Sequence, residues 1–354
     1  MSEQNIPEYL LYATQNHASD IFIIAGHSLC FKIDGKLSNY KERLMPDDTE
    51  RIIRQIYSMA DNRNLEILLQ KGDDDFSFSI PGLSRFRVNT YRQRGSLAAV
   101  IRVIAFELPD PDALNIPENV MSVSDFTKGM VLVTGPAGSG KSTTLACIVD
   151  RINHSREGHI ITLEDPLEYL HRHDKCIVSQ REICTDTESY LVSLRATLRQ
   201  SPDVILLGEM RDYETIQTAM TAAETGHLIL SSLHTTGAAN TIGRIVDVFD
   251  PEQQRQISIQ LSMVLQAVIS QQLVPDVNGH SIPVFEVMRL NPAIRNMIRD
   301  NKVHQIDGVI ASSTQEHMIS MDQSLLDLYK KKKITKETAL KYSSNAEMLK
   351  RKLL

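Results

Sequence analysis

The chain has 354 residues, 42% hydrophobic and 23% charged, which are the values of an ordinary globular protein with room for two domains. Its formal net charge of −6 argues against nucleic acid as the main partner, because surfaces that bind a duplex are usually strongly basic. No apolar run approaches the roughly 20 residues of a membrane span, and the start MSEQNIPEYL lacks a signal-peptide pattern, so we expect a cytoplasmic protein.

Residues 1–106 have the pattern of a small α+β domain. Apolar residues at helical spacing cover 48–70 in two pieces, and Asp34-Gly35 offers a tight hairpin-type turn. In DFSFSI the alternation predicts a strand with the aromatic residues on one face. Candidate strands follow one another at 21–26, 29–34, 75–80, 85–94 and 97–106.

A second domain is predicted beyond a linker. Residues 107–119 contain three prolines, which favour extended chain, and we place the linker there. From residue 120 short apolar strands alternate with helical segments, which predicts a mainly parallel sheet covered on both faces. In such sheets ligands bind beyond the carboxyl ends of the strands. The expected strands are 130–134, 159–164, 204–208 and 227–233.

The last hundred residues are expected to be helical. Further short helices are predicted within 322–342, and the four lysines at 330–333 are interpreted as a solvated face. One apolar stripe at helical spacing consists of Ile257, Leu261, Val264, Leu265 and Val268. The predicted division of the chain is an N-terminal domain 1–106, the linker 107–119, a core 120–290 and a helical C-terminal region 291–354.

The most specific motif is GPAGSGKSTT at 135–144, which matches G-x-x-x-x-G-K-[ST] between an apolar strand and a helix. Its glycines let backbone N–H groups point at phosphate oxygens, and the helix N-terminus adds partial positive charge. The Lys141 ammonium can reach the β- and γ-phosphates, and the Ser142 hydroxyl can ligate Mg²⁺. The sequence therefore predicts that ATP and Mg²⁺ are bound by Gly135, Pro136, Ala137, Gly138, Ser139, Gly140, Lys141, Ser142 and Thr143.

Two of the predicted strands end in acidic residues, Glu164-Asp165 and Glu209. A parallel sheet brings both ends beside the phosphate loop, where hydrolysis needs a group that positions water. The common Walker B pattern has an Asp that holds Mg²⁺ through water, whereas this chain has Gly208 there and only Glu209 follows. We expect Glu164, Glu209 and, as a further metal candidate, Asp165 to share the water and metal duties, in a division that the sequence leaves open.

Two histidines, His227 and His234, bracket the fourth strand in TGHLILSSLHT. A histidine on an apolar strand is more often a core residue with its hydrogen bonds satisfied, and that interpretation stays open for both. A strand-end imidazole beside the γ-phosphate could instead sense hydrolysis by exchanging hydrogen bonds.

These motifs and their order along the chain resemble those of the secretion-ATPase superfamily of type II and type IV secretion and type IV pili. They are the Walker A loop, an aspartate box (ITLEDPLEYLH), a Gly-Glu Walker B (VILLGEMRD) and a histidine box (TGHLILSSLHT), and the resemblance covers essentially the whole chain. It implies an α/β fold with a RecA-like P-loop NTPase core, an N-terminal PAS-like α+β domain and a helical C-terminal region. The missing Walker B aspartate is itself a mark of that superfamily.

Within the superfamily the chain is most similar to the pilus retraction ATPases of twitching motility. The blocks RFRVNTYRQRG, LRATLRQSPDVILLGEMRD and SMDQSLLDLY look like family blocks. AIRNMIRDNK, which carries Arg295 and Arg299, resembles a motif linked with retraction, although the residues alone favour an amphipathic helix with both arginines in water. Assembly and type II secretion ATPases usually carry a tetracysteine metal site, and the four cysteines here form no C-x-x-C pair.

The resemblance implies a homohexamer with ATP bound between the two domains of each subunit, where N-terminal arginines, with Arg85, Arg92 and Arg94 as candidates, neutralise transition-state charge. It implies a motor for pilus retraction at the inner face of the cytoplasmic membrane, acting on a platform protein and indirectly on pilin, without direct contact to nucleic acid. The alternatives are a pilus assembly or type II secretion ATPase, a nucleic-acid translocase, and a nucleotide switch that barely hydrolyses ATP.

Overall fold

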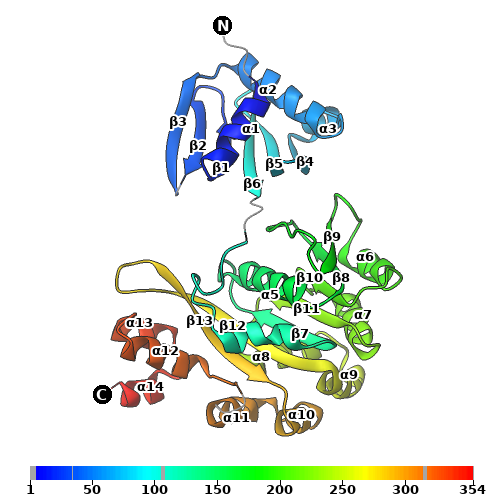
Figure 1. Cartoon of the computed structure of the whole chain (residues 1–354), viewed down its shortest axis with the longest axis vertical. Coiled ribbons are helices and arrows are strands. Elements are labelled where there is room, and N and C mark those ends of the chain that lie inside the picture. The colour runs from blue at the N-terminus through cyan, green and yellow to red at the C-terminus, as the bar shows by residue number, and fades with distance from the viewer. Residues whose placement is uncertain (1–4, 34, 105–107, 314–316, 354) are drawn as a thin grey trace. The chain divides into compact units, whose positions relative to one another are not determined.

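The computed structural model describes residues 5–33, 35–104, 108–313 and 317–353, and the chain forms two compact units (Figure 1). The first comprises Met1–Glu107 with Glu168–Leu170, and the second comprises Leu108–Leu167 with His171–Leu354. Each unit has its own sheet and its own hydrophobic core. Within the described ranges, no helix combines the length and the apolar character that crossing a membrane requires.

The first unit is built on a six-stranded antiparallel sheet in the order β3-β2-β1-β6-β5-β4. Phe76 and Phe78 point into its core, as the alternation in β4 predicts, and Phe31 and Phe86 are fully buried there. Gly35 has the positive φ that a tight turn requires, while Asp34 lies outside the described residues. The elements are α1 (Ile6–Gln15), β1 (Ala18–Ile23), β2 (Ser28–Ile33), β3 (Lys36–Arg43), α2 (Pro46–Met59), α3 (Glu66–Lys71), β4 (Asp73–Ile80), β5 (Ser84–Gln93) and β6 (Ser96–Ile104).

The second unit contains a seven-stranded sheet in the order β13-β12-β7-β11-β10-β8-β9. All neighbouring strands pair in parallel except β13, which runs antiparallel to β12. The parallel core confirms the α/β expectation. Its strands are β7 (Gly129–Thr134), β8 (Gly158–Glu164), β9 (Cys176–Glu182), β10 (Val204–Leu207), β11 (Leu228–Leu233), β12 (Leu265–Pro275) and β13 (Ser281–Arg289).

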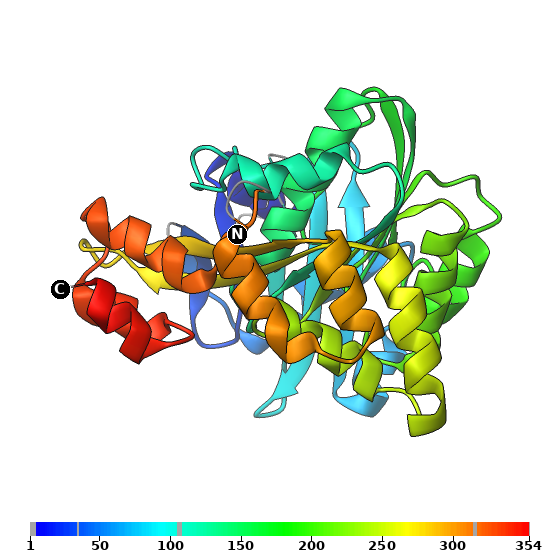
Figure 2. The same cartoon turned by 90° about the horizontal axis from the view of Figure 1, so that it is seen from below.

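Helices cover both faces of this sheet (Figures 1 and 2). Alternate residues of β7 point to opposite faces of the sheet. Val131 and Val133 pack with α5, while Met130 and Leu132 pack with the helices of the other face. The helical elements are α4 (Glu118–Met121), η1 (Ser122–Asp125), α5 (Lys141–Ser155), α6 (Tyr190–Thr197), α7 (Tyr213–Glu224), α8 (Ala238–Asp247), α9 (Pro251–Val264), α10 (Pro292–Arg299), η2 (Val303–Gln305), α11 (Ile306–Ser312), α12 (Met321–Lys330), α13 (Lys336–Tyr342) and α14 (Ala346–Lys352).

The expectation of an all-helical last hundred residues is wrong for 265–289. Helix α9 ends at Val264, so Leu265 and Val268 of the predicted helical stripe lie on β12 instead. A strand buried on both faces shows no alternation, and its apolar run is easily taken for a helix. Pairing with β7 on one side and β13 on the other decides the matter. The short helices predicted within 322–342 are confirmed as parts of α12 and α13.

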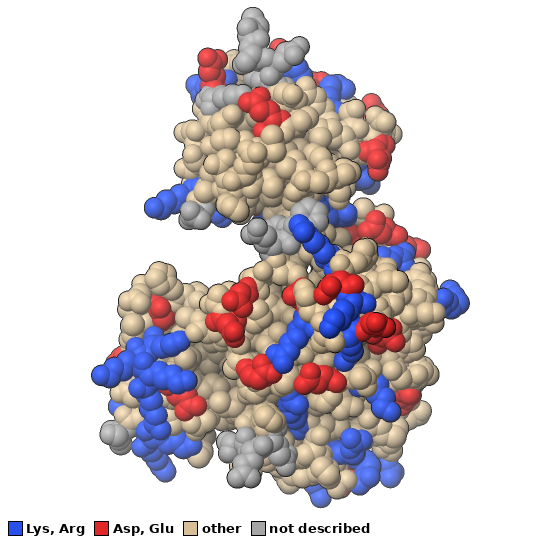
Figure 3. All heavy atoms as spheres, viewed as in Figure 1, with Lys and Arg blue, Asp and Glu red and all other residues tan. Residues whose placement is uncertain are grey.

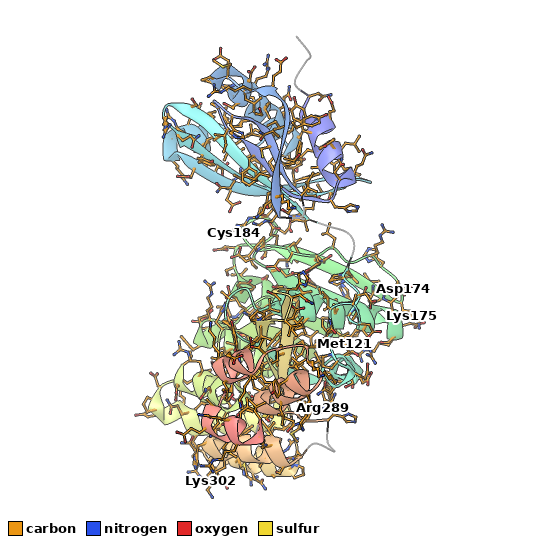
Figure 4. All side chains as sticks on the ribbon, turned by 90° about the vertical axis from the view of Figure 1, so that its left-hand side faces the viewer. Met121, Asp174, Lys175, Cys184, Arg289 and Lys302 are labelled. Atoms are coloured by element: carbon orange, nitrogen blue, oxygen red, sulfur yellow. The ribbon has the colours of Figure 1, made fainter. Side chains whose placement is uncertain are left out.

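The predicted linker is packed onto the second unit from residue 108 onward. Ile116 is buried in the core cluster on the α5 face, so this stretch is part of the domain rather than a free tether. Arg289, at the end of β13, donates from Nη2 to the Oγ of Ser122 at 2.6 Å; Figure 4 labels Arg289 and Met121, the residue before Ser122. Cys30, Cys147 and Cys176 are buried, and Cys184 is exposed.

Candidate functional site

The phosphate loop lies at the carboxyl end of β7, between this strand and α5, as expected. Its glycines are structural requirements. A Cβ on Gly135 would lie 2.1 Å from the backbone oxygen of Gln271 on β12, and Gly138 and Gly140 have φ values of +74° and +85°. The loop therefore keeps a tight curl that opens onto the N-terminus of α5, an arrangement suited to phosphate.

The side chains of the loop fit a phosphate ligand. Lys141 Nζ is held at 2.9 Å from the carbonyl oxygens of Gly135 and Pro136, and the residue is only 7% exposed. The buried Ser139 hydroxyl has no hydrogen-bond partner among the described residues, so it is ready to bond a ligand. Gln271 supports the loop from β12, because its Oε1 accepts from Thr144 Oγ1 at 2.8 Å.

The packing around Gly208 leaves no room for the side chain of a Walker B aspartate. A Cβ at this position would lie 2.7 Å from the hydroxyl of Tyr190, the first residue of α6, so a side chain here would displace the tyrosine. Burial, followed by the charges of Glu209, Asp165 and Glu164, raises the pKa of Tyr190 above its usual range. The tyrosine therefore stays neutral, with its hydroxyl among the three acidic residues that were predicted to gather here.

Glu164 is the last residue of β8 and is half-buried. Its Oε1 is 3.5 Å from Nε2 of Gln180 on the neighbouring strand β9, and Gln180 Oε1 in turn accepts from the backbone N–H of His171 at 2.7 Å. The amide thus connects Glu164 to the far end of the aspartate box. Asp165 follows in the loop and is exposed.

Glu209 is at the centre of a small charged cluster. Its Oε2 accepts from Nε of Arg211 at 2.7 Å and lies 3.5 Å from Nε2 of His234, which follows β11. The Glu209 side chain is 14% exposed and that of Arg211 is 77% exposed, so the glutamate is fixed on the protein side while the arginine reaches into solvent. The hydrogen bond to Glu209 raises the pKa of Arg211 further, so the guanidinium stays charged.

One predicted candidate, His227, and one acidic residue near the site, Asp212, have structural roles. His227 lies at the amino end of β11, the opposite edge of the sheet from the phosphate loop, and its Nδ1 is 2.9 Å from the carbonyl oxygen of Ala222. Of the two interpretations left open for His227, this position favours a histidine with satisfied hydrogen bonds over a sensor of γ-phosphate. Asp212 caps helix α7 by accepting from the N–H and the hydroxyl of Thr215, both at 2.8 Å.

The remaining candidates are arginines. Arg295 and Arg299 are on α10, whose Ile294 and Ile298 are buried while Arg299 is exposed, the amphipathic arrangement that the residues alone favoured. Arg85 and Arg92 are on β5 of the first unit, and Arg94 occupies the turn that follows with a φ of +47°. Their approach to a nucleotide stays a prediction.

The donor set fits Mg²⁺ bound with a nucleotide. Mg²⁺ takes one or two protein ligands together with phosphate oxygens, and Ser142 at the start of α5 with the acidic residues at the neighbouring strand ends supplies that number. The described residues contain no cluster of three or more His, Cys, Asp or Glu arranged for a metal ion alone. Sequence reasoning missed Tyr190, Gln180, Arg211 and Gln271, because their part in the site depends on contacts between distant segments.

Comparisons with known proteins agree with this site. A family model described as type II/IV secretion system protein matches residues 2–291. The type IV pilus retraction ATPase PilT of Pseudomonas aeruginosa is 42% identical over 95% of this chain and 97% of that protein. A twitching motility protein of Neisseria gonorrhoeae is 42% identical over 85% of this chain and 80% of its own length.

A solved structure extends the similarity to the fold. The crystal structure of the pilus retraction motor PilT with bound ADP superimposes with a TM-score of 0.89 at 44% identity, and the match covers 99% of this chain and 100% of that chain. The resemblance to secretion ATPases that the four short motifs indicate is thereby confirmed over nearly the full length. This chain belongs to the type II/IV secretion system protein family.

Proposed function

We propose that this protein is an ATP-hydrolysing motor that powers the retraction of type IV pili. The observation that carries the proposal is the gathering of the phosphate loop, Glu164 and Glu209 at one edge of a parallel sheet. The choice of retraction over other secretion work is supported by similarity to a retraction ATPase across 95% of this chain and 97% of that protein.

The residues divide the chemistry as follows. The loop amides and Lys141 hold the phosphates, and Ser142 would ligate Mg²⁺, which neutralises phosphate charge when bound. Glu164 accepts a proton from a water molecule that attacks the γ-phosphorus, the bond from that phosphorus to the β–γ bridging oxygen breaks, and ADP and phosphate are released. Glu209, oriented by Arg211 and His234, would hydrogen-bond to water bound by that ion.

The protein works as a homohexamer in this proposal. Arginines of the first unit, Arg85, Arg92 or Arg94, supply positive charge to the transition state. The RecA-like second unit and the PAS-like first unit change their relative orientation as nucleotide turns over. The ring is cytoplasmic and peripheral to the inner face of the cytoplasmic membrane, where it turns a platform protein and so withdraws pilin subunits.

Deletion of the gene tests the proposal when surface pili and retraction are scored in the same cells. We expect pili to be present, measured by immunoblot of sheared pilin, and to be static when labelled pili are followed by fluorescence microscopy. Complementation with the wild type should restore retraction, and the Lys141→Ala variant should not. Bald cells would overturn the proposal in favour of an assembly ATPase.

A further inference from the structure

The charge of the chain is divided very unevenly. Residues 330–354 contain nine basic and two acidic side chains, a formal charge of +7, while the other 329 residues contain 29 basic and 42 acidic side chains, a formal charge of −13. The overall value of −6 therefore conceals a strongly basic C-terminal segment. Such an asymmetry indicates an anionic partner for that segment.

The basic side chains gather on one body. They come from the end of α12, from α13, from α14 and from the turns between these helices, and Figure 3 shows them as a blue cluster at the lower left of the molecule. Eight of the nine basic residues are exposed. We call this set, residues 330–333, 336, 341 and 350–352, the C-terminal basic surface.

The three helices hold this surface rigidly. Leu325, Ile334 and Leu349 are buried together against Val274 and Val284 of the β12–β13 hairpin. The Asp322 carboxylate ties the start of α12 to the turn before α14 by accepting from the N–H groups of Ser344 and Asn345, at 2.7 and 3.0 Å. The helices therefore fix where the basic side chains leave the backbone, so that no segment of the main chain has to fold when the surface meets a partner.

Other roles account for only part of the cluster. Lys350, Arg351 and Lys352 occupy the last turn of α14, where positive charge stabilises the helix dipole, and Lys333 Nζ donates to Asn115 Oδ1 at 2.8 Å. The lysines at 331 and 332 are in the turn after α12 and are exposed. Helix stabilisation therefore does not explain why the turn is as basic as the helix end.

We infer that the C-terminal basic surface binds the anionic headgroups of a lipid bilayer. Eight of its nine cations are lysines, which act as hydrated point charges and suit a diffuse plane of negative headgroups, whereas structured phosphate contacts favour the arginine fork. Met348, 57% exposed on α14, lies one turn before Arg351 and Lys352 on the same side of the helix. An exposed apolar side chain among cations is suited to a membrane interface.

Features of the surface disfavour nucleic acid and a pocket ligand. The nearby aromatic residues Tyr329 and Tyr342 are partly buried against the local core, which limits the area that they offer for stacking of bases. The adjoining cavity of about 750 Å³ is lined by Lys341 and Lys352 but also by Glu286, Asp307 and Asp322, so a headgroup phosphate would meet carboxylates inside it. Binding is therefore assigned to the outer surface and not to the cavity.

The inference deepens the peripheral membrane location proposed above and rests on that location for its biological setting. The acidic remainder of the chain is repelled by an anionic bilayer, so attraction at the C-terminal basic surface would also orient the protein. The interaction should weaken steeply with salt, because the charges are exposed.

The test is sedimentation of the purified full-length protein with vesicles of phosphatidylglycerol and phosphatidylcholine, and with vesicles of phosphatidylcholine alone. The test variant changes Lys331, Lys332, Lys350 and Arg351 to Gln. The control variant changes Lys71, Lys128, Lys175 and Arg255, exposed residues outside the C-terminal basic surface, to Gln, and so removes the same number of lysines and arginines. Circular dichroism confirms that both variants are folded.

We expect binding of the wild type and the control to anionic vesicles only, reversed at high salt, and a partition coefficient at least about tenfold lower for the test variant. Equal binding by the test variant, equal loss in the control, or binding to neutral vesicles would overturn the inference. The inference would also be overturned if the protein bound a homopolymeric RNA through the same four residues and did not bind vesicles. If the protein drives retraction but does not bind anionic vesicles, the membrane inference fails and the proposed function stands. If the protein binds anionic vesicles but its deletion leaves retraction unchanged, the proposed function fails and the membrane inference stands.

Discussion

The two edges of the seven-stranded sheet carry similar polar residues and use them differently. At the carboxyl edge, Glu164, Glu209 and His234 gather around a glycine loop and a helix N-terminus. At the amino edge, Asp203 and His227 each hydrogen-bond to neighbouring backbone, for example Asp203 Oδ2 to the N–H of His159 at 2.8 Å. Strand direction, rather than residue type, separates groups for a ligand from groups that hold the fold.

The largest effect is expected at the carboxyl edge for Lys141→Ala. The change removes the ammonium that would meet the β- and γ-phosphates, so hydrolysis should fall by about 10³-fold. Saturating ADP should raise the Tm of the wild type and leave that of the variant almost unchanged, since only binding to the native state stabilises. Phosphate release and thermal melting measure the two effects. Normal hydrolysis by the variant would place the nucleotide elsewhere.

His234→Gln should lower the rate of hydrolysis by about tenfold, because the imidazole helps to orient Glu209. The Tm should change little, since the side chain is 54% exposed. Steady-state rates measured at saturating and at subsaturating ATP distinguish a change in kcat from a change in KM. A rate equal to that of the wild type would remove His234 from the site.

Gly208→Ala tests the contact that replaces the Walker B aspartate. The added methyl group would lie 2.7 Å from the Tyr190 hydroxyl, and we expect a loss of about 1–3 kcal/mol in the free energy of unfolding. Adding Tyr190→Phe, which deletes that hydroxyl, should recover most of the loss. Denaturant unfolding of both single variants and the double variant measures the coupling. A double variant less stable than Gly208→Ala alone would contradict the explanation.

The smallest catalytic effect is expected at the amino edge for His227→Ala. Loss of the hydrogen bond to Ala222 should cost about 1 kcal/mol and lower the Tm by about 2–4 °C. Hydrolysis should stay within about twofold of the wild type. A drop in rate as large as that of His234→Gln would break the distinction between the two edges.

The sequence alone predicts the fold and the site correctly where the local residue pattern matches the local structure. The apolar strands 130–134, 159–164 and 204–208, with the glycine loop and the acids at their ends, predicted the central strands and the side chains at the carboxyl edge. For strand β12 the sequence predicts helix, because a strand buried on both faces shows no alternation of apolar and polar residues; its pairing with β7 identifies it as a strand.

Other parts of the site needed long-range contacts. Tyr190 could not be predicted because nothing near it in the chain shows that Gly208 leaves room for its hydroxyl. Gln180 was missed with the whole of β9, a half-polar edge strand whose mixed pattern in CIVSQRE gives little signal. Likewise, the sequence does not show that His227 and His234 lie at opposite edges of the sheet, because this depends on the direction in which β11 runs.

The central claim is that the carboxyl edge hydrolyses ATP through Glu164. It is tested most directly by measuring nucleotide binding and phosphate release for purified Glu164→Gln beside the wild type. We predict an unchanged Kd for ATP and a rate of hydrolysis lower by about 10²-fold or more, because the amide cannot accept the proton of the attacking water. A variant that binds ATP and hydrolyses it at the wild-type rate would contradict the account.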